Sequence, residues 1–215
     1  MSNPQIIKIN PQITKKRQLE IILQRIPAHP HPKVNLEQYS TPAVIAADIL
    51  WNAHAMGDIE CMKVVDLGCG TGIFTVGSAL LGAGEVVGVD VDPYAVEIAQ
   101  SEASDMELSE RTRFISTDIK DFDEKADTVI QNPPFGAQKA NKEADRQFMI
   151  KALEIAPVVY SFHIKETENF VENFFRSIGG KVTHRFYYRF PILHIYDFHK
   201  KEKVDVDVVV LRVEK

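Results

Sequence analysis

Short apolar runs alternate with helical periodicity along most of the chain. Runs of four or five mostly apolar residues predict buried strands, and apolar residues that recur every three or four positions predict helices. Strands are expected at Val64–Leu67, Val86–Asp90, Arg113–Ser116, Thr128–Gln131 and Val158–Phe162. Helices are expected at Gly72–Leu81, Tyr94–Ala103, Asp145–Ile155 and Thr167–Ile178. Such alternation predicts a parallel sheet with helices on both faces.

The two ends of the chain depart from this alternation. His184–Phe190 and Val204–Val213 read as strands with no helix between them, so they should pair antiparallel at one end of the sheet. Before the first strand, periodicity predicts a helix over Ile13–Ile26 and another over Ala43–Ala55, with Thr41 as its N-cap. The pattern therefore predicts an α/β fold with a seven-stranded, mostly parallel sheet.

The composition is that of one globular unit. The chain has 215 residues, 45% hydrophobic and 26% charged, which suits a single domain with a substantial core and excludes general disorder. No apolar run approaches the length of a membrane span, and the first residues lack a charged start followed by an apolar stretch. We therefore expect a soluble, cytoplasmic protein.

The net charge of −5 conceals an uneven distribution. Residues 1–33 carry six Lys or Arg against one acid, residues 34–180 carry eleven against twenty-four, and residues 181–203 carry six against two. From charge alone, solvated faces are the simpler interpretation of the basic ends. They favour a nucleic-acid partner only if both border the same site, and we predict that both border the edge where Asn132 lies.

A glycine-rich turn follows the first strand. Asp66 precedes Gly68, Gly70 and Gly72, and the helix begins there, whereas a dinucleotide fingerprint requires a third glycine at position 73, which is Ile. The spacing instead resembles the first motif of class I S-adenosyl-L-methionine methyltransferases. In that family the glycines admit the cofactor closely, and the preceding acid helps to hold its methionine portion.

The next two strands also end in acids. Asp90 lies twenty-two positions after Gly68, where an acid that accepts two ribose hydroxyls is expected. Asp118 stands where family members bind the adenine amine of the cofactor, and Ile119 would pack against the ring. An isolated acid is more commonly a loop or capping residue, as we expect for Asp92. Three successive strand ends with this chemistry predict an S-adenosyl-L-methionine site.

The fourth strand leads into Asn132-Pro133-Pro134-Phe135, the tetrapeptide of methyltransferases that modify planar nitrogens. An exocyclic amine on a ring is a poor nucleophile because its lone pair is delocalised. Hydrogen bonds from its two N–H groups to the Asn132 oxygen and to a carbonyl near Pro133 would favour a pyramidal nitrogen aimed at the methyl donor. The prolines restrict the backbone, and Phe135 offers a stacking face for a flipped base.

The chain is similar to the methyltransferase-like 5 family of ribosomal RNA adenine-N6 methyltransferases. The resemblance rests on the glycine motif and on residues 36–42, 127–136, 159–163 and 198–201, and it extends from Leu36 to the C-terminus. It implies a Rossmann-like class I methyltransferase domain over residues 36–215, preceded by a helical extension over residues 1–35 that packs on it. It also implies an archaeal or other non-human member that transfers a methyl group to adenine N6 in RNA.

The resemblance assigns further cofactor contacts. Gln38 and Thr41 would reach over the cofactor, and Gly68, Thr71 and Ile73 would line its methionine side. The chain departs from the human-type pattern at Thr71, where that pattern has a cysteine, and at Ser40, where it has a proline. The first 30 residues show no clear match.

Two places could receive partners. The family's eukaryotic member pairs with a small zinc-binding activator subunit, and the third strand, with Arg111 and Arg113 near it, would be the exposed sheet edge for such a partner. The two arginines could either protect this edge or suit a partner, so the need for an activator subunit stays open. Phosphate contacts are expected in the loop Phe198–Lys203, from Lys200, Lys201 and Lys203. No cluster of His, Cys and Asp has metal-ligand spacing, so no metal is predicted in this chain.

Four other functions are compatible with parts of the pattern. The same tetrapeptide serves guanine-N2 methylation of RNA. Enzymes that methylate the glutamine of release factors usually have Tyr in place of Phe135 and an added helical domain, and DNA enzymes carry a target-recognition domain. The non-enzymatic alternative is a silent RNA-binding scaffold, which an intact Asn132 and the series of acids disfavour.

Overall fold

One seven-stranded sheet organises the chain, with strands in the order β3-β2-β1-β4-β5-β7-β6. The computed structural model describes residues 13–33, 36–135, 144–193 and 203–215. The strands are β1 (Lys63–Leu67), β2 (Glu85–Asp90), β3 (Thr112–Ser116), β4 (Thr128–Gln131), β5 (Val158–Ile164), β6 (Lys181–Leu193) and β7 (Lys203–Glu214). Strands β1 to β5 are parallel, and β7 is antiparallel to both β5 and β6. The predicted fold is therefore confirmed, including the antiparallel terminal pair and β3 as an edge.

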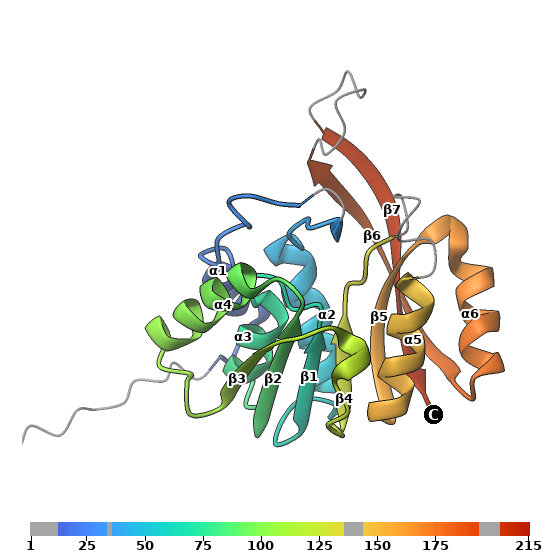
Figure 1. Ribbon diagram of the computed structural model, residues 1–215, viewed down its shortest axis with the longest axis horizontal. Coiled ribbons are helices and arrows are strands. Elements are labelled where there is room, and N and C mark those ends of the chain that lie inside the picture. Colours follow the sequence, from blue (N-terminus) through green and yellow to red (C-terminus); the bar gives the residue numbers. More distant parts are fainter. Residues whose placement is uncertain (1–12, 34–35, 136–143, 194–202) are drawn as a thin grey trace, which may run out of the picture.

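Helices cover both faces of the sheet (Figure 1). One layer holds α1 (Lys16–Leu23), α2 (Ala43–Ala55), α3 (Ile73–Leu80) and α4 (Pro93–Asp105). The other holds α5 (Ala144–Ile155), α6 (Glu168–Ser177) and the short 3-10 turn η2 (Ile119–Asp121); a second such turn, η4 (Lys165–Thr167), precedes α6. In the part of the chain that the structure describes, no helix is long and apolar enough to cross a membrane.

The two layers explain why the strands are apolar on both sides. Val64 of β1 packs in the core beneath α2 and α3, whereas the next residue, Val65, packs in the separate core beneath α5 and α6. Alternate side chains of a strand point to opposite faces, so a sheet covered on both faces needs nearly continuous apolar strands. In β2 and β4 the polar residues consequently lie at the ends of the strands.

The terminal strands are longer than predicted. Tyr188 of β6 and Ile164, the last residue of β5, both align with Val208 of β7. Beyond this level β6 and β7 pair only with each other and project past the sheet as a two-stranded ribbon (Figure 1). Lys203 begins β7 rather than belonging to a loop, because the pairing extends as far as Leu193.

Two expectations for the N-terminal part need correction. The first helix spans only Lys16–Leu23, shorter than the expected Ile13–Ile26. The N-cap of α2 is Pro42, and no side chain caps the helix there, so Thr41 does not have the predicted capping role. Its hydroxyl instead accepts a hydrogen bond from Asn132.

Gly72 allows α3 to begin close to α4. Its φ is +90°, and a Cβ at this position would lie 2.9 Å from Cβ of Ala99 on α4. That atom is short and attached to a helix, so it cannot move aside as the end of a long side chain could. The start of α3 and the turn before it are thus fixed by a contact that only glycine permits.

We expect Gly72→Ala to lower the free energy of unfolding by about 2–5 kcal/mol, which combines left-handed backbone strain with overpacking against Ala99. Urea unfolding measures this loss. Gly57→Ala is the matched control, because Gly57 has a φ of +79° but a Cβ added there would have no heavy atom within 4 Å. The control should lose only the backbone contribution, roughly 1–2 kcal/mol, and equal losses in the two variants would contradict the packing argument.

Candidate active site

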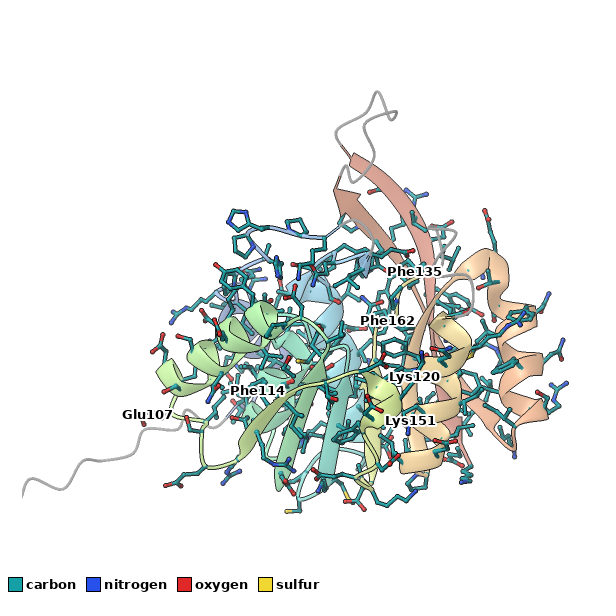
Figure 2. The ribbon with its side chains drawn as sticks, in the orientation of Figure 1. Glu107, Phe114, Lys120, Phe135, Lys151 and Phe162 are labelled. Atoms are coloured by element: carbon teal, nitrogen blue, oxygen red, sulfur yellow. The ribbon has the colours of Figure 1, made fainter. Side chains whose placement is uncertain are left out.

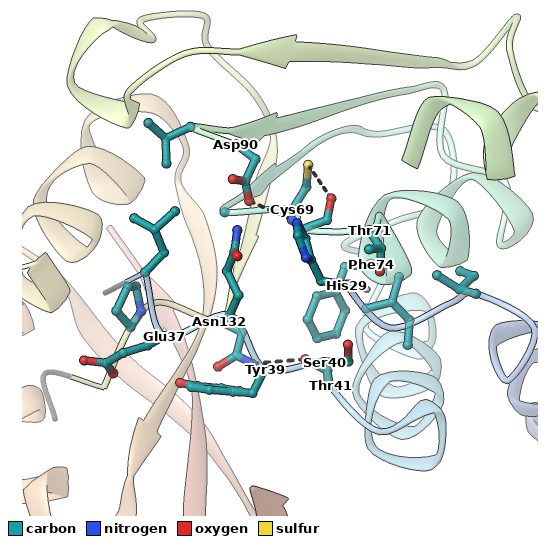
Figure 3. A pocket seen from close by; sticks show the side chains of 18 of the residues that line it. His29, Glu37, Tyr39, Ser40, Thr41, Cys69, Thr71, Phe74, Asp90 and Asn132 are labelled. Carbon is teal, nitrogen blue, oxygen red and sulfur yellow. Dashed lines mark hydrogen bonds between the residues drawn. The ribbon is translucent and has the colours of Figure 1, made fainter. Parts of the chain in front are cut away.

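A cavity of about 520 Å³ opens at the carboxyl ends of the parallel strands. This is the edge at which open α/β sheets bind ligands. Its walls come from the end of α1 and the segment after it, residues 36–43, the turn after β1, the ends of β2 and β3, residues 132 and 134, and α5. Figure 3 shows side chains from these segments turned towards one another.

The turn between β1 and α3 forms the floor of the cavity. Gly68, Gly70 and Gly72 all have positive φ angles, of 74°, 52° and 90°. The amides of Gly68 and Cys69 donate to the carbonyl of Val89 at 2.8 and 3.0 Å, which ties the turn to β2. A Cβ on Gly70 would have no heavy atom within 4 Å, so the backbone at this position is directly accessible to a ligand.

Asp66 is buried beneath this turn and does not line the cavity. Its Oδ2 accepts hydrogen bonds from the amide and the hydroxyl of Thr75, at 2.9 and 2.7 Å. Its Oδ1 is also buried and has no hydrogen-bond partner. Burial raises the pKa of Asp66 to about 7, although the bonds from Thr75 oppose that rise. Asp66 therefore stabilises the turn from the side away from the cavity, and its side chain does not reach a ligand in the cavity.

Asp90 and Asp118 face the cavity from neighbouring strand ends. The carboxylate of Asp90 accepts from the Gly70 amide at 2.8 Å and from the Asp92 amide at 2.9 Å. Burial raises the pKa of Asp90. Asp118 accepts from the Lys120 amide at 3.0 Å as the N-cap of η2. The two acids predicted for ribose and adenine are thus brought to one wall, and Ile119 lines the cavity beside them.

The segment before α2, of which residues 29–33 and 36–41 are described, lines part of the cavity and is attached to Asp92. Asp92 is 1% exposed and accepts from Gln38 Nε2 at 2.8 Å and from Lys33 Nζ at 3.1 Å. His29 Nε2 lies 3.2 Å from the same carboxylate. Asp92 is also the N-cap of α4, as predicted, accepting from the Tyr94 amide. The sequence pattern gave no sign that one capping acid would also hold this segment.

The Asn132 tetrapeptide meets the same segment. Asn132 Nδ2 donates to Thr41 Oγ1 at 3.0 Å, while Asn132 Oδ1 is buried and has no partner. The Tyr39 hydroxyl donates to the Pro133 carbonyl at 3.3 Å. The Tyr39 ring stacks on Phe135, with centroids 5.1 Å apart and an angle of 30° between the planes. Figure 2 places Phe135 where the β6–β7 ribbon leaves the sheet.

Most of the predicted site residues come together. Those that line the cavity are Gln38, Thr41, Gly68, Gly70, Thr71, Ile73, Asp90, Asp118, Ile119, Asn132 and Pro134. Asp66, Pro133 and Phe135 do not line it. Lys200 and Lys201 fall outside the described residues, as does the side chain of Lys203.

Several lining residues carried no assigned role, among them His29, Tyr39, Cys69 and Phe74. Tyr39 stands between Gln38 and Thr41, both predicted to contact the cofactor, and this position in the sequence could have indicated that Tyr39 lines the cavity. Cys69 lies within the glycine motif itself. Within the described ranges, no group of three or more His, Cys, Asp or Glu is arranged to hold a metal.

The expectation that both basic ends border this site holds only in part. Leu23, at the carboxyl end of α1, lines the cavity, but Lys15 to Arg17 stand at the opposite end of the helix, about 12 Å away along its axis. Lys16 pairs with Asp48 of α2. The prediction is therefore wrong for the N-terminal basic cluster, because of the direction in which α1 runs. The β6–β7 pair does reach the site through Phe190, which contacts Tyr39, but Arg185 of β6 pairs with Glu168 and Glu172 of α6 instead.

Comparison with known protein families gives one partial match. The model of the ribosomal protein L11 methyltransferase (PrmA) family matches residues 50–133. This stretch contains the glycine turn and the acids at the ends of β1, β2 and β3, and it ends within the Asn132 tetrapeptide.

Comparison with individual proteins gives matches over nearly the whole chain. An uncharacterized protein of Methanocaldococcus jannaschii is 42% identical over 213 residues, which cover 94% of each chain. The rRNA N(6)-adenosine-methyltransferase METTL5 of Danio rerio is 35% identical over 204 residues, which cover 92% of this chain and 98% of the relative. The crystal structure of PH1948 from Pyrococcus horikoshii superimposes with a TM-score of 0.87 at 40% identity, covering 94% of this chain and 98% of that one.

The buried carboxyl group of Asp66 predicts a pH-dependent stability. Its folded pKa of about 7 lies above the ordinary 3.8, so between these values the folded protein retains a proton that the unfolded chain releases. The contribution of Asp66 to stability therefore falls as the pH rises through this window, by roughly 1.4 kcal/mol per pH unit at most.

Asp66→Asn should remove this dependence. Urea unfolding at pH 5, 6, 7 and 8 should show the wild-type protein losing stability relative to the variant as the pH rises. Asp105→Asn, at an exposed position on α4, is the matched control. A difference between wild type and Asp66→Asn that stays constant across this range would contradict the assignment.

Proposed function

We infer the function from membership of a family: the chain belongs to the METTL5 family, whose named relatives are rRNA N6-adenosine methyltransferases. The protein is an S-adenosylmethionine-dependent methyltransferase that transfers a methyl group to the exocyclic N6 amine of an adenine in RNA. Two archaeal relatives, at 40 and 42% identity, exceed the 27–35% of the animal relatives and agree with a non-human member. We propose ribosomal RNA as the substrate and, with it, a cytoplasmic location.

We propose that the cavity holds S-adenosylmethionine. Its volume of about 520 Å³ falls in the range of sites for small ligands. The accessible backbone at Gly70 suits close approach of the cofactor's methionine portion, and the carboxylates of Asp90 and Asp118 suit ribose hydroxyls and an adenine amine. Thr71 and Ile73 flank the turn, and Asp66 supports it from behind. When bound, the cofactor supplies an electrophilic methyl group on a positively charged sulfur.

The observation that supports amine methylation most directly is the orphaned oxygen of Asn132. A buried acceptor without a partner costs free energy, and a ligand amine that donates to Asn132 Oδ1 would remove that cost. Thr41 fixes the amide through Nδ2, which leaves Oδ1 free to accept. The Pro133 carbonyl lies next along the chain as a second acceptor, and Pro134 restricts the backbone after it.

These groups would act on the target amine in a defined way. The Asn132 side-chain oxygen and the Pro133 carbonyl accept hydrogen bonds from its two N–H groups. These bonds disfavour the planar nitrogen and direct its lone pair away from the ring. Phe135 supplies an aromatic face for the flipped base. The methylated amine is acidic and passes its proton to water, so the described residues need supply no tuned general base.

Further partners and the domain boundary follow from the same proposal. We propose that the free edge of β3 receives a small activator subunit, since β3 has a strand neighbour on one side only. Arg113 on this strand is engaged with Glu85 and Glu124. We propose Lys200, Lys201 and Lys203 as phosphate contacts. Residues 36–215 would form the methyltransferase domain, with residues 1–35 as its extension.

Identification of the methylated product tests this function. The protein is incubated with radiolabelled S-adenosylmethionine and unmodified ribosomal RNA, and the RNA is then digested to nucleosides. We expect the label in N6-methyladenosine. Label in N2-methylguanosine, or only in protein, would overturn the assignment to adenine N6. Cofactor binding without any transfer would indicate a required partner or a silent scaffold.

Asn132→Ala should abolish transfer while the cofactor still binds. Removal of one of two acceptors for the amine should lower kcat by at least about 100-fold, as loss of a transition-state hydrogen bond does elsewhere. Calorimetry with S-adenosylmethionine should show an affinity close to that of wild type. Asn52→Ala is the matched control, because the Asn52 amide donates to the Asp48 carbonyl within α2. Transfer by Asn132→Ala at the wild-type rate would exclude the proposed role.

A further inference from the structure

The aromatic ring of Tyr39 lies where a substrate base is expected. It stacks on Phe135, the residue proposed to carry the base, at 5.1 Å between centroids. Its hydroxyl donates to the Pro133 carbonyl, one of the two acceptors proposed for the target amine. A flat aromatic ring with a polar hydrogen at its rim thus already makes two of the contacts that an adenine would make.

The third expected contact, a hydrogen bond to Asn132 Oδ1, is missing because tyrosine has fewer donors than adenine. A phenol carries one O–H, whereas an exocyclic amine carries two N–H groups. Tyr39 satisfies the Pro133 carbonyl, and Asn132 Oδ1 remains buried without a partner. Of the two acceptors proposed for the amine, Asn132 Oδ1 is therefore the one that would receive the second N–H.

The surroundings of the stacked pair are fixed. Phe190 of β6 is fully buried and meets both rings edge-on, at 5.6 Å from Tyr39 and 6.4 Å from Phe135. Phe135 does not line the cavity, while Tyr39 does. A base can therefore stack on Phe135 against the Phe190 edge only if Tyr39 leaves its place.

We propose that Tyr39 is a placeholder for the target adenine: the incoming base displaces the Tyr39 ring from Phe135 and the Tyr39 hydroxyl from the Pro133 carbonyl. This inference rests on the proposed function. Without substrate, Tyr39 thus satisfies one of the two acceptors proposed for the amine and leaves the other, Asn132 Oδ1, without a partner. The cost of moving Tyr39 is subtracted from the affinity for RNA, and the apparent KM for RNA rises accordingly.

The position of Tyr39 also connects this site to the cofactor. Its neighbour Gln38 is bonded to Asp92 at the cofactor side of the cavity, and Thr41, two residues on, is bonded to Asn132. A movement of Tyr39 therefore occurs between two anchored residues. We expect the side chain to swing while the segment on either side stays attached.

Tyr39→Phe tests the proposal because it keeps the ring and removes the hydroxyl that competes for the Pro133 carbonyl. One hydrogen bond of ordinary strength corresponds to roughly a 2- to 10-fold change. The apparent KM for RNA should fall by about this factor, with kcat for N6-methyladenosine retained and cofactor affinity unchanged. An unchanged or raised KM would mean that Tyr39 is a fixed wall of the site and would overturn the proposal.

Tyr187→Phe is the matched control. Its hydroxyl donates to Glu168, and its ring is 51% exposed, away from the stacked pair. Its kinetic constants should match those of wild type. If wild-type protein forms no N6-methyladenosine at all, the proposed function fails before this comparison begins, so the two failures are distinguishable.

A spectroscopic measurement follows the movement of Tyr39 itself. The chain has six tyrosines, so 3-fluorotyrosine labelling gives six fluorine resonances, and Tyr39→Phe identifies the one from Tyr39. The probe is a fragment of ribosomal RNA that wild-type protein methylates, added with S-adenosylhomocysteine. The Tyr39 resonance should shift on binding of this fragment. A resonance that stays in place while the fragment is bound would overturn the proposal.

Discussion

The buried carboxylate of Asp66 holds the turn on which the site depends. It accepts both the amide and the hydroxyl of Thr75, and so it fixes the first turn of α3 to the end of β1. The glycines between these two points have little freedom left, and the amide of Gly70 is thereby directed to Asp90. Burial makes this carboxyl group costly to ionise, and the hydrogen bonds from Thr75 that oppose the rise in its pKa are the same ones that fix the turn at the floor of the cavity.

A second constraint joins the two halves of the site. The segment from Gln38 to Thr41 lines the cavity and is bonded at one end to Asp92 and at the other to Asn132. The groups proposed for the cofactor and those proposed for the substrate therefore do not lie on independent loops. They share one short piece of chain, which comes from before the first strand and is positioned by contacts more than fifty residues away in sequence.

The sequence was informative where chemistry follows directly from strand ends. Runs such as Val86–Asp90 predicted the strands well, and the parallel topology then placed Asp90, Asp118 and Asn132 at one edge. Orientation of side chains was less accessible. Nothing in the pattern indicated that Asp66 faces α3 rather than the cavity, that Thr41 bonds Asn132 instead of capping α2, or that α1 presents its basic end away from the site. These depend on tertiary contacts between distant segments.

The projecting β6–β7 ribbon has no third strand beside it beyond the end of β5, and isolated two-stranded ribbons are only marginally stable. The end of the ribbon nearest the sheet is held to the rest of the protein by side chains. Phe190 packs against the Tyr39 and Phe135 rings, and the Tyr188 hydroxyl donates to Asp48. The order of this ribbon therefore depends on which ring packs against Phe190. If a substrate base displaces Tyr39, as proposed, that base takes over the contact with Phe190, and substrate binding would then change the rigidity of the ribbon.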